Sequence, residues 1–209
     1  MKTSLALLVF VFLLLYAFGV SAANNYVRIA LPHGVSMELP RNWVALSRNQ
    51  RITLDSSVQA RTEGIGMLDA SSDLNFGANL YDEENKTAAI VNIRYYPDME
   101  LTQADARAAT RADVQDLDGM LKSSLVQAGK AFGFSLVKWV GTSSRTINGT
   151  VAFVTEYERS PLNNNGNFRV RLVRVFNKIA SFTVTVSYRA SQEYLLRPIC
   201  DRIIASIKA

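Results

Sequence analysis

The C-terminal half of the chain consists of consecutive strand-like segments joined by short turns, and this pattern constrains the fold most. Asn148-Gly149 separates two segments rich in Val, Thr and Phe. Both positions tolerate the positive φ that a two-residue hairpin turn requires. The predicted strands cover 134–139, 145–147, 150–159, 168–176 and 180–188. Because strands joined so tightly pair antiparallel, the sequence predicts an antiparallel sheet.

Helices are predicted before and after these strands. Ser47 and Gln50 have the spacing of a capping box, and Thr102 with Asp105 marks a second helix start. The second helix is predicted to continue unbroken to about Ala128, because apolar residues recur along it at intervals of three and four. The predicted helices cover 48–61, 102–128 and 191–207, and the remaining predicted strands cover 35–39, 43–44, 76–81 and 87–96. A doubly wound nucleotide-binding fold is disfavoured because strands and helices do not alternate; the pattern indicates an α+β fold with helices packed on an antiparallel sheet.

The first 22 residues resemble a secretory signal peptide. Met1-Lys2 precedes an apolar run over 5–20, and Val20-Ser21-Ala22 places small residues at a cleavage site. A retained membrane anchor is the alternative, but the run is shorter than the roughly 20 residues that span a bilayer. We therefore predict cleavage near Ala22, a single mature domain over 23–209, and a periplasmic or secreted protein.

Charge and cysteine content limit the partners of the mature chain. The formal net charge is +5, and loss of Lys2 with the leader lowers it to +4. Basic and acidic residues are interleaved, so nucleic acid is not an expected partner, whereas a weak contact with an anionic membrane surface is compatible with this charge.

Cys200 is the only cysteine and cannot form an internal disulfide; its isoleucine neighbours predict a buried thiol.

No pattern in the sequence predicts a metal site or a cofactor. His33 is the only histidine and is predicted to lie in a loop without a catalytic role. Asp113, Asp116 and Asp118 lack the glycine and the distal glutamate of a calcium loop. They are predicted to lie on a solvated helix face.

Glu156 and Glu158 support two different interpretations. As paired carboxylates on one strand face, they could serve a glycoside hydrolase. If the chain turns at Asn163-Asn164, however, Glu158 lies opposite Arg169 and Glu156 lies opposite Arg171. We favour this cross-strand charge ladder, in which each pair is worth roughly 0.2–1 kcal/mol.

The pairing of the last two strands is predicted from the burial of apolar residues. A three-residue turn at 177–179 would set Leu172 opposite Val184 and Val170 opposite Val186. The apolar face would then pack on the final helix, through Leu195, Ile199, Ile203 and Ile207. The other face is predicted to be open and to form a binding surface of Glu156, Glu158, Arg169, Arg171, Thr183 and Thr185.

Both ends of the mature chain resemble the PsbP/DcrB-like proteins. The segment from Val35 to Trp43 matches their opening strand followed by Pro and Trp. The strand from Phe182 to Tyr188 and the helix ending in 203–207 (IIASI) match their closing elements. The resemblance implies an α/β/α sandwich and an exported accessory or binding role, and the family shares no catalytic motif that could be transferred.

We therefore expect a non-enzymatic accessory or binding protein of the cell envelope. The alternative is a carboxylate-dependent hydrolase that uses Glu156 and Glu158. A weaker alternative is a structural protein at an anionic membrane surface. The sequence identifies neither the partner, which could be a protein or another envelope component, nor the oligomeric state.

Overall fold

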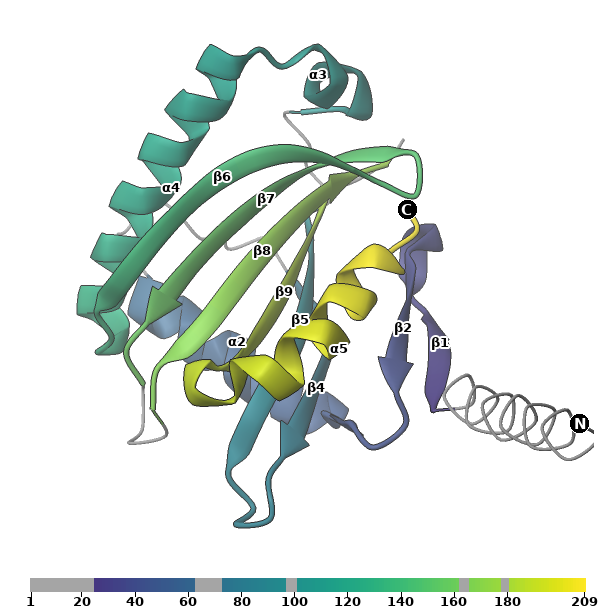
Figure 1. Ribbon diagram of the computed structural model, residues 1–209, viewed down its shortest axis with the longest axis vertical. Coiled ribbons are helices and arrows are strands. Elements are labelled where there is room, and N and C mark those ends of the chain that lie inside the picture. Colours follow the sequence, from purple (N-terminus) through teal and green to yellow (C-terminus); the bar gives the residue numbers. More distant parts are fainter. Residues whose placement is uncertain (1–24, 63–72, 97–100, 162–165, 178–180) are drawn as a thin grey trace, which may run out of the picture.

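A seven-stranded antiparallel sheet forms the centre of the protein (Figure 1). The computed structural model describes residues 25–62, 73–96, 101–161, 166–177 and 181–209. The strand order is β3-β4-β5-β9-β8-β7-β6. These strands are β3 (Val44–Ala45), β4 (Asp73–Tyr81), β5 (Thr87–Tyr96), β6 (Leu136–Ile147), β7 (Thr150–Arg159), β8 (Phe168–Phe176) and β9 (Ser181–Arg189). The leader and the turn at Asn163-Asn164 lie outside the described residues.

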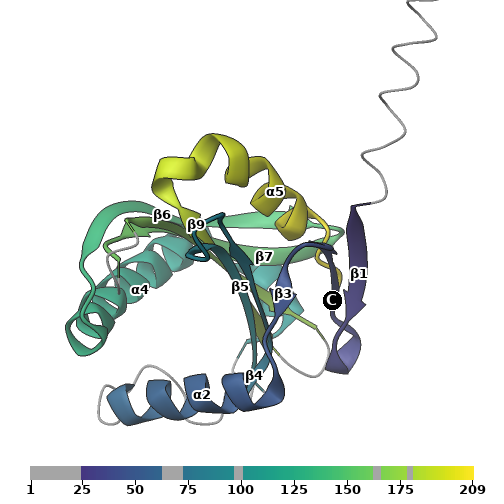
Figure 2. The ribbon, with the colours of Figure 1, turned by 90° about the horizontal axis from the view of Figure 1, so that it is seen from below.

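Helices cover both faces of the sheet, so the predicted α/β/α sandwich is confirmed. In Figure 2, α5 (Glu193–Ala205) lies on one face, and α2 (Arg48–Thr62) and α4 (Arg111–Phe132) lie on the other. The short α3 (Gln103–Ala108) packs on β7 and β8. A separate hairpin of β1 (Tyr26–Ala30) and β2 (Ser36–Pro40), joined by the 3-10 turn η2 (Pro32–Gly34), lies beside α5. None of the helices among the described residues has the length and apolarity needed to cross a bilayer.

The hairpin of β6 and β7 forms at the predicted turn. Asn148 and Gly149 adopt φ values of 47° and 81°, as a two-residue turn of this kind requires. The prediction of two separate strands at 134–139 and 145–147 was wrong, because β6 is continuous. The pairing of β6 with β7 contains two register shifts, between Leu136 and Lys138 and between Trp139 and Gly141. Gly141, at the second shift, has a φ of 123° that favours glycine.

Local capping determines where the helices begin. Ser47 and Gln50 exchange the two hydrogen bonds of the predicted capping box at the start of α2. The single helix predicted over 102–128 was wrong, because the chain forms α3 and α4 with a break at Ala109. Each helix has its own Thr-x-x-Asp capping box, the first at Thr102 and the second at Thr110. The second box offers the backbone a helix start and so competes with continuation of the first helix.

The predicted register between β8 and β9 was wrong by one residue. Leu172 lies opposite Thr185, and Val173 lies opposite Val184. The prediction assumed one buried and one open face, whereas both faces of these strands are covered. Val173 and Val175 pack with α5, while Phe168 and Val170 face the side of the sheet that carries α4. Apolar residues at successive positions can therefore all be buried, and burial alone does not select the register.

The face that α5 presents to the sheet also differs from the prediction. Leu195 is 65% exposed, whereas Leu196, Cys200, Ile203 and Ile207 are buried. The 3-10 turn η3 (Ala190–Gln192) precedes the helix, which begins at Glu193. The buried positions recur at intervals of three and four, so the helix keeps an apolar stripe, displaced toward Leu196 and Cys200.

Candidate functional site

The predicted charge ladder between β7 and β8 is present. Glu158 pairs in register with Arg169, and Glu156 pairs with Arg171. The Nη2 atom of Arg169 lies 3.5 Å from Oε2 of Glu158, and its Nη1 atom lies 3.8 Å from Oε1 of Glu156. The Nε atom of Arg171 lies 3.4 Å from Oε2 of Glu156. Side chains alternate between the two faces of a strand. The pairing of β7 with β8 therefore places these four charged side chains together on one face of the sheet.

Helix α5 covers the ladder, which the sequence had predicted to lie on an open face. Asp201 of α5 accepts a hydrogen bond from Nη1 of Arg171, and Glu193 lies 3.5 Å from Arg169. Arg171 is only 6% exposed. Although burial disfavours the charged form of Arg171, its hydrogen bond to Asp201 and the charges of Asp201 and Glu156 raise its pKa above the ordinary value. The prediction of an open face was therefore wrong.

Thr183 and Thr185 lie on the opposite face of the sheet from the four charged residues. Strand pairing aligns Thr183 with Arg174 and Thr185 with Leu172, both on the side that carries α4. The one-residue difference in register explains the split, because it transfers every side chain of β9 to the other face relative to the prediction. The six predicted binding residues therefore occupy two separate surfaces.

The pairing of Glu156 and Glu158 argues against their use as a hydrolytic pair. Each carboxylate contacts a guanidinium, and Glu158 also accepts a hydrogen bond of 2.9 Å from Nδ2 of Asn167. Glycoside hydrolysis needs one carboxyl group that donates a proton and another that attacks or activates water. Carboxylates held as acceptors in a charge ladder suit neither role well.

A cleft beside the ladder is the candidate binding site. It has a volume of about 330 Å³ and lies between the β6–β7 hairpin and α5. We call it the α5 cleft; its lining is Arg145, Thr146, Ile147, Asn148, Val154, Arg171, Asp201, Ile204 and Ala205. Its volume lies within the roughly 300–1,000 Å³ typical of ligand pockets. Four aliphatic side chains and two arginines thus border the same space.

Asn148 fixes one end of the α5 cleft. Its Nδ2 atom donates hydrogen bonds of 2.7 Å to the backbone carbonyls of Ala205 and Ile207. The Ala205 carbonyl belongs to the last turn of α5, where carbonyls lack donors within the helix, and Ile207 lies just beyond the helix end. The hairpin turn is therefore hydrogen-bonded to the C-terminal end of α5, and Asn148 lines the cleft at this point.

Arg145 provides the accessible positive charge of the α5 cleft. It is exposed, and its Nε atom donates to Oγ of Ser143 at 3.2 Å. Within the described ranges no carboxylate forms an ion pair with it. Arg171, in contrast, is neutralised by Glu156 and Asp201. An anionic group entering the cleft would therefore meet Arg145 as its cation, next to the aliphatic wall.

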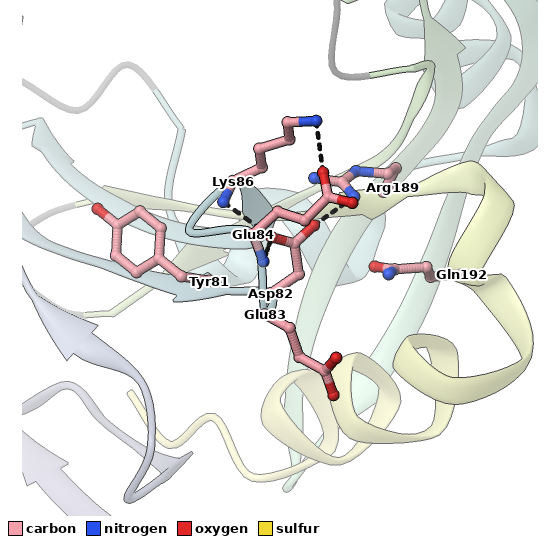
Figure 3. A pocket seen from close by; sticks show the side chains of 7 residues that line it. All are labelled: Tyr81, Asp82, Glu83, Glu84, Lys86, Arg189 and Gln192. Carbon is pink, nitrogen blue, oxygen red and sulfur yellow. Dashed lines mark hydrogen bonds and ion pairs between the residues drawn. The ribbon is translucent and has the colours of Figure 1, made fainter.

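A second hollow lies at the turn between β4 and β5 (Figure 3). Four of the charged residues that line it form two pairs: Arg189 donates to Asp82 at 2.7 Å, and Lys86 donates to Glu84 at 2.6 Å. The pKa of Asp82 lies below its ordinary value, mainly because of the hydrogen bond from Arg189 and secondly because of the hydrogen bond from the backbone N–H of Lys86. Arg189 also donates to the carbonyl of Thr87 at 2.8 Å. These interactions stabilise the turn between β4 and β5, and we assign the residues around this hollow a structural role.

The remaining candidate residues take part in core packing, ring stacking, helix capping or hydrogen bonding. Cys200 is buried, as predicted, and burial raises the pKa of its thiol to about 12. The ring of His33 stacks on Tyr95 with centroids 4.1 Å apart. Asp113 caps α4, and Asp118 accepts hydrogen bonds from the Trp139 indole and the Thr142 backbone. Among the described residues, no group of three His, Cys, Asp or Glu side chains is placed to hold a metal ion.

Comparison with solved structures identifies the fold. The cyanobacterial PsbP protein (CyanoP) from Synechocystis matches with a TM-score of 0.55 and 14% identity, over 91% of this chain and 96% of CyanoP. The chain has the PsbP-like fold. At this identity the likeness concerns the fold alone, and it confirms the architecture that the terminal motifs had implied.

Two further structures align with this PsbP-like chain at lower scores. PA94 from Pseudomonas aeruginosa has 15% identity and a TM-score of 0.42, covering 89% of this chain and 98% of PA94. LpqN from Mycobacterium tuberculosis has 13% identity and a TM-score of 0.43, covering 88% of this chain and 91% of LpqN. No protein-family model and no curated protein matches the sequence.

Sequence reasoning missed the residues that α5 contributes. Glu193, Arg197 and Asp201 are spaced four apart and form one charged stripe along the helix. This stripe was visible in the sequence and could have indicated that the helix lies over the charged strands. Arg145 gave no comparable signal, because only the tertiary structure places it at a cleft.

Proposed function

We propose that this PsbP-like protein is an exported, non-enzymatic binding protein whose partner engages the α5 cleft. The single observation that carries the proposal is Arg145, an exposed arginine without a carboxylate partner in the described structure, at a 330 Å³ cleft with aliphatic walls. Its chemistry suits an anionic group attached to an apolar body, supplied by a protein or another envelope component. The paired carboxylates of the ladder support binding over catalysis.

The proposal of export rests on the leader-like segment over 1–22. The mature protein is expected to begin at Ala23 or Asn24, because Val20-Ser21-Ala22 supplies the small residues that a signal peptidase requires. N-terminal sequencing of protein recovered from the exported fraction tests this. Membrane-embedded protein that retains Met1 would contradict the proposal of export.

The role of the α5 cleft is tested by reversing the charge of Arg145. Mature protein and its Arg145→Glu variant are used to capture partners from the native envelope fraction, with quantification by mass spectrometry. Specific partners are expected to decrease at least about tenfold with the variant, since a lost charged contact is worth roughly 1.5–3 kcal/mol.

Arg48→Glu is the matched control for this experiment. Arg48 is also exposed, but it lies on α2, on the other side of the sheet. Both variants change the net charge equally, so a general electrostatic effect would lower capture in both. Equal capture by Arg145→Glu and unmodified protein would reject the α5 cleft as the binding site.

A further inference from the structure

Thr183 lies between two arginines on the sheet face opposite the α5 cleft. Strand pairing sets it opposite Arg94 of β5 on one side and opposite Arg174 of β8 on the other. Side chains directly opposite in neighbouring strands share one face. Arg94 forms an ion pair of 2.8 Å with Asp55 of α2, so its charge is compensated.

The charge of Arg174 is not compensated in the same way. Its guanidinium lies 5.7 Å from the ring centroid of Tyr96, and within the described residues it forms no ion pair with a carboxylate. The side chain is partly buried. A partly desolvated guanidinium whose N–H groups have no carboxylate partner among the described residues strongly favours a carboxylate or another oxyanion nearby.

The hydroxyl of Thr183 also lacks a partner. Its Oγ1 atom is buried and forms no hydrogen bond with any described residue. A buried hydroxyl without a partner destabilises a protein, because its hydration is lost and not replaced. An acceptor that binds here would satisfy both Thr183 and Arg174.

These two side chains border a small pocket between α4 and the sheet. It has a volume of about 40 Å³. Its lining is Leu117, Leu121, Phe153, Thr155, Leu172, Arg174 and Thr183. Since one water needs about 10–15 Å³ measured in this way, the pocket has room for roughly three waters. It is far smaller than the roughly 300 Å³ at which pockets begin to enclose whole ligands.

We propose that this Arg174 pocket receives the carboxylate of an acidic side chain from a protein partner. The charge of Arg174 and the Thr183 hydroxyl select an oxyanion, and the leucines beside them accommodate the methylene groups of Asp or Glu. The small volume requires that the rest of the ligand remain outside, as it does when one side chain of a protein inserts. This surface is separate from the α5 cleft, since the two lie on opposite faces of the sheet.

The test is an NMR titration of the mature ¹⁵N-labelled protein with a hexaglutamate peptide. The Thr183 amide and the Arg174 Nε–H are expected to shift and to saturate. Arg174→Gln and Thr183→Val are each expected to weaken binding about tenfold, as expected for loss of a charge-assisted hydrogen bond. Thr183→Val should melt at or above the temperature of the unmodified protein, because it removes an unpartnered hydroxyl.

Thr185→Val is the matched control, since Thr185 lies on the same strand face but does not line the pocket. Its affinity for the peptide should be unchanged. The proposal is overturned if Arg174→Gln binds as tightly as the unmodified protein. It is also overturned if Thr183→Val loses stability without losing affinity, or if phosphatidylglycerol vesicles produce the shifts and the peptide does not.

Discussion

Replacing Trp43 with alanine is expected to lower the free energy of unfolding by about 3–5 kcal/mol. Trp43 is 6% exposed, as the sequence predicted, and belongs to the main core cluster with Met37, Val91 and Ile203. The substitution would leave a large cavity where β3 joins the sheet. Urea denaturation followed by circular dichroism measures the change.

Trp43→Phe is the informative control for this prediction. The indole Nε1 of Trp43 is buried and has no hydrogen-bond partner among the described residues. Phenylalanine therefore removes no hydrogen bond and leaves a smaller cavity than alanine, so the loss is expected to be well below that of Trp43→Ala. A loss below about 1 kcal/mol for Trp43→Ala itself would show that the ring contributes little to the core.

Replacing Arg171 with methionine is expected to destabilise the protein by about 3 kcal/mol, the second largest effect that we predict. The substitution leaves Glu156 and Asp201 without their shared cation beneath α5. Removing one partner of a buried ion pair is costly because the remaining charge stays desolvated, here that of Glu156, whose side chain is 15% exposed. Adding Glu156→Gln should recover part of the loss, and the double-mutant cycle measures the coupling.

Arg197→Met provides a comparison at an exposed arginine of α5, the helix that covers the ladder. Its side chain is 53% exposed and forms an i,i+4 ion pair with Glu193. Because exposed pairs of this kind are worth roughly 0–1 kcal/mol, the variant should remain close to the unmodified protein in stability. Equal losses of stability for Arg171→Met and Arg197→Met would show that burial of the ladder contributes nothing to the free energy of unfolding.

Features that depend on neighbouring residues were predictable. The Asn148-Gly149 turn needs only two residues that tolerate positive φ, and the Ser47–Gln50 capping box needs only a spacing of three. The pairing of Glu156 with Arg171 was predictable because side chains alternate along each strand and one turn joins the two strands. The antiparallel sheet with packed helices followed from the same local signals, because tight turns leave few ways to pair the strands.

The sequence by itself therefore determined the order of most elements, the caps, the β6–β7 hairpin and the charge ladder. Only the tertiary structure decided the β8–β9 register, the coverage of the ladder by α5 and the separation of Thr183 from Glu156. The physical reason is that strands buried on both faces carry apolar residues at successive positions, so their own pattern does not distinguish the two registers. The α5 cleft, likewise, lies where Asn148 contacts Ala205 and Ile207 across more than fifty residues of chain, a contact that no local pattern encodes.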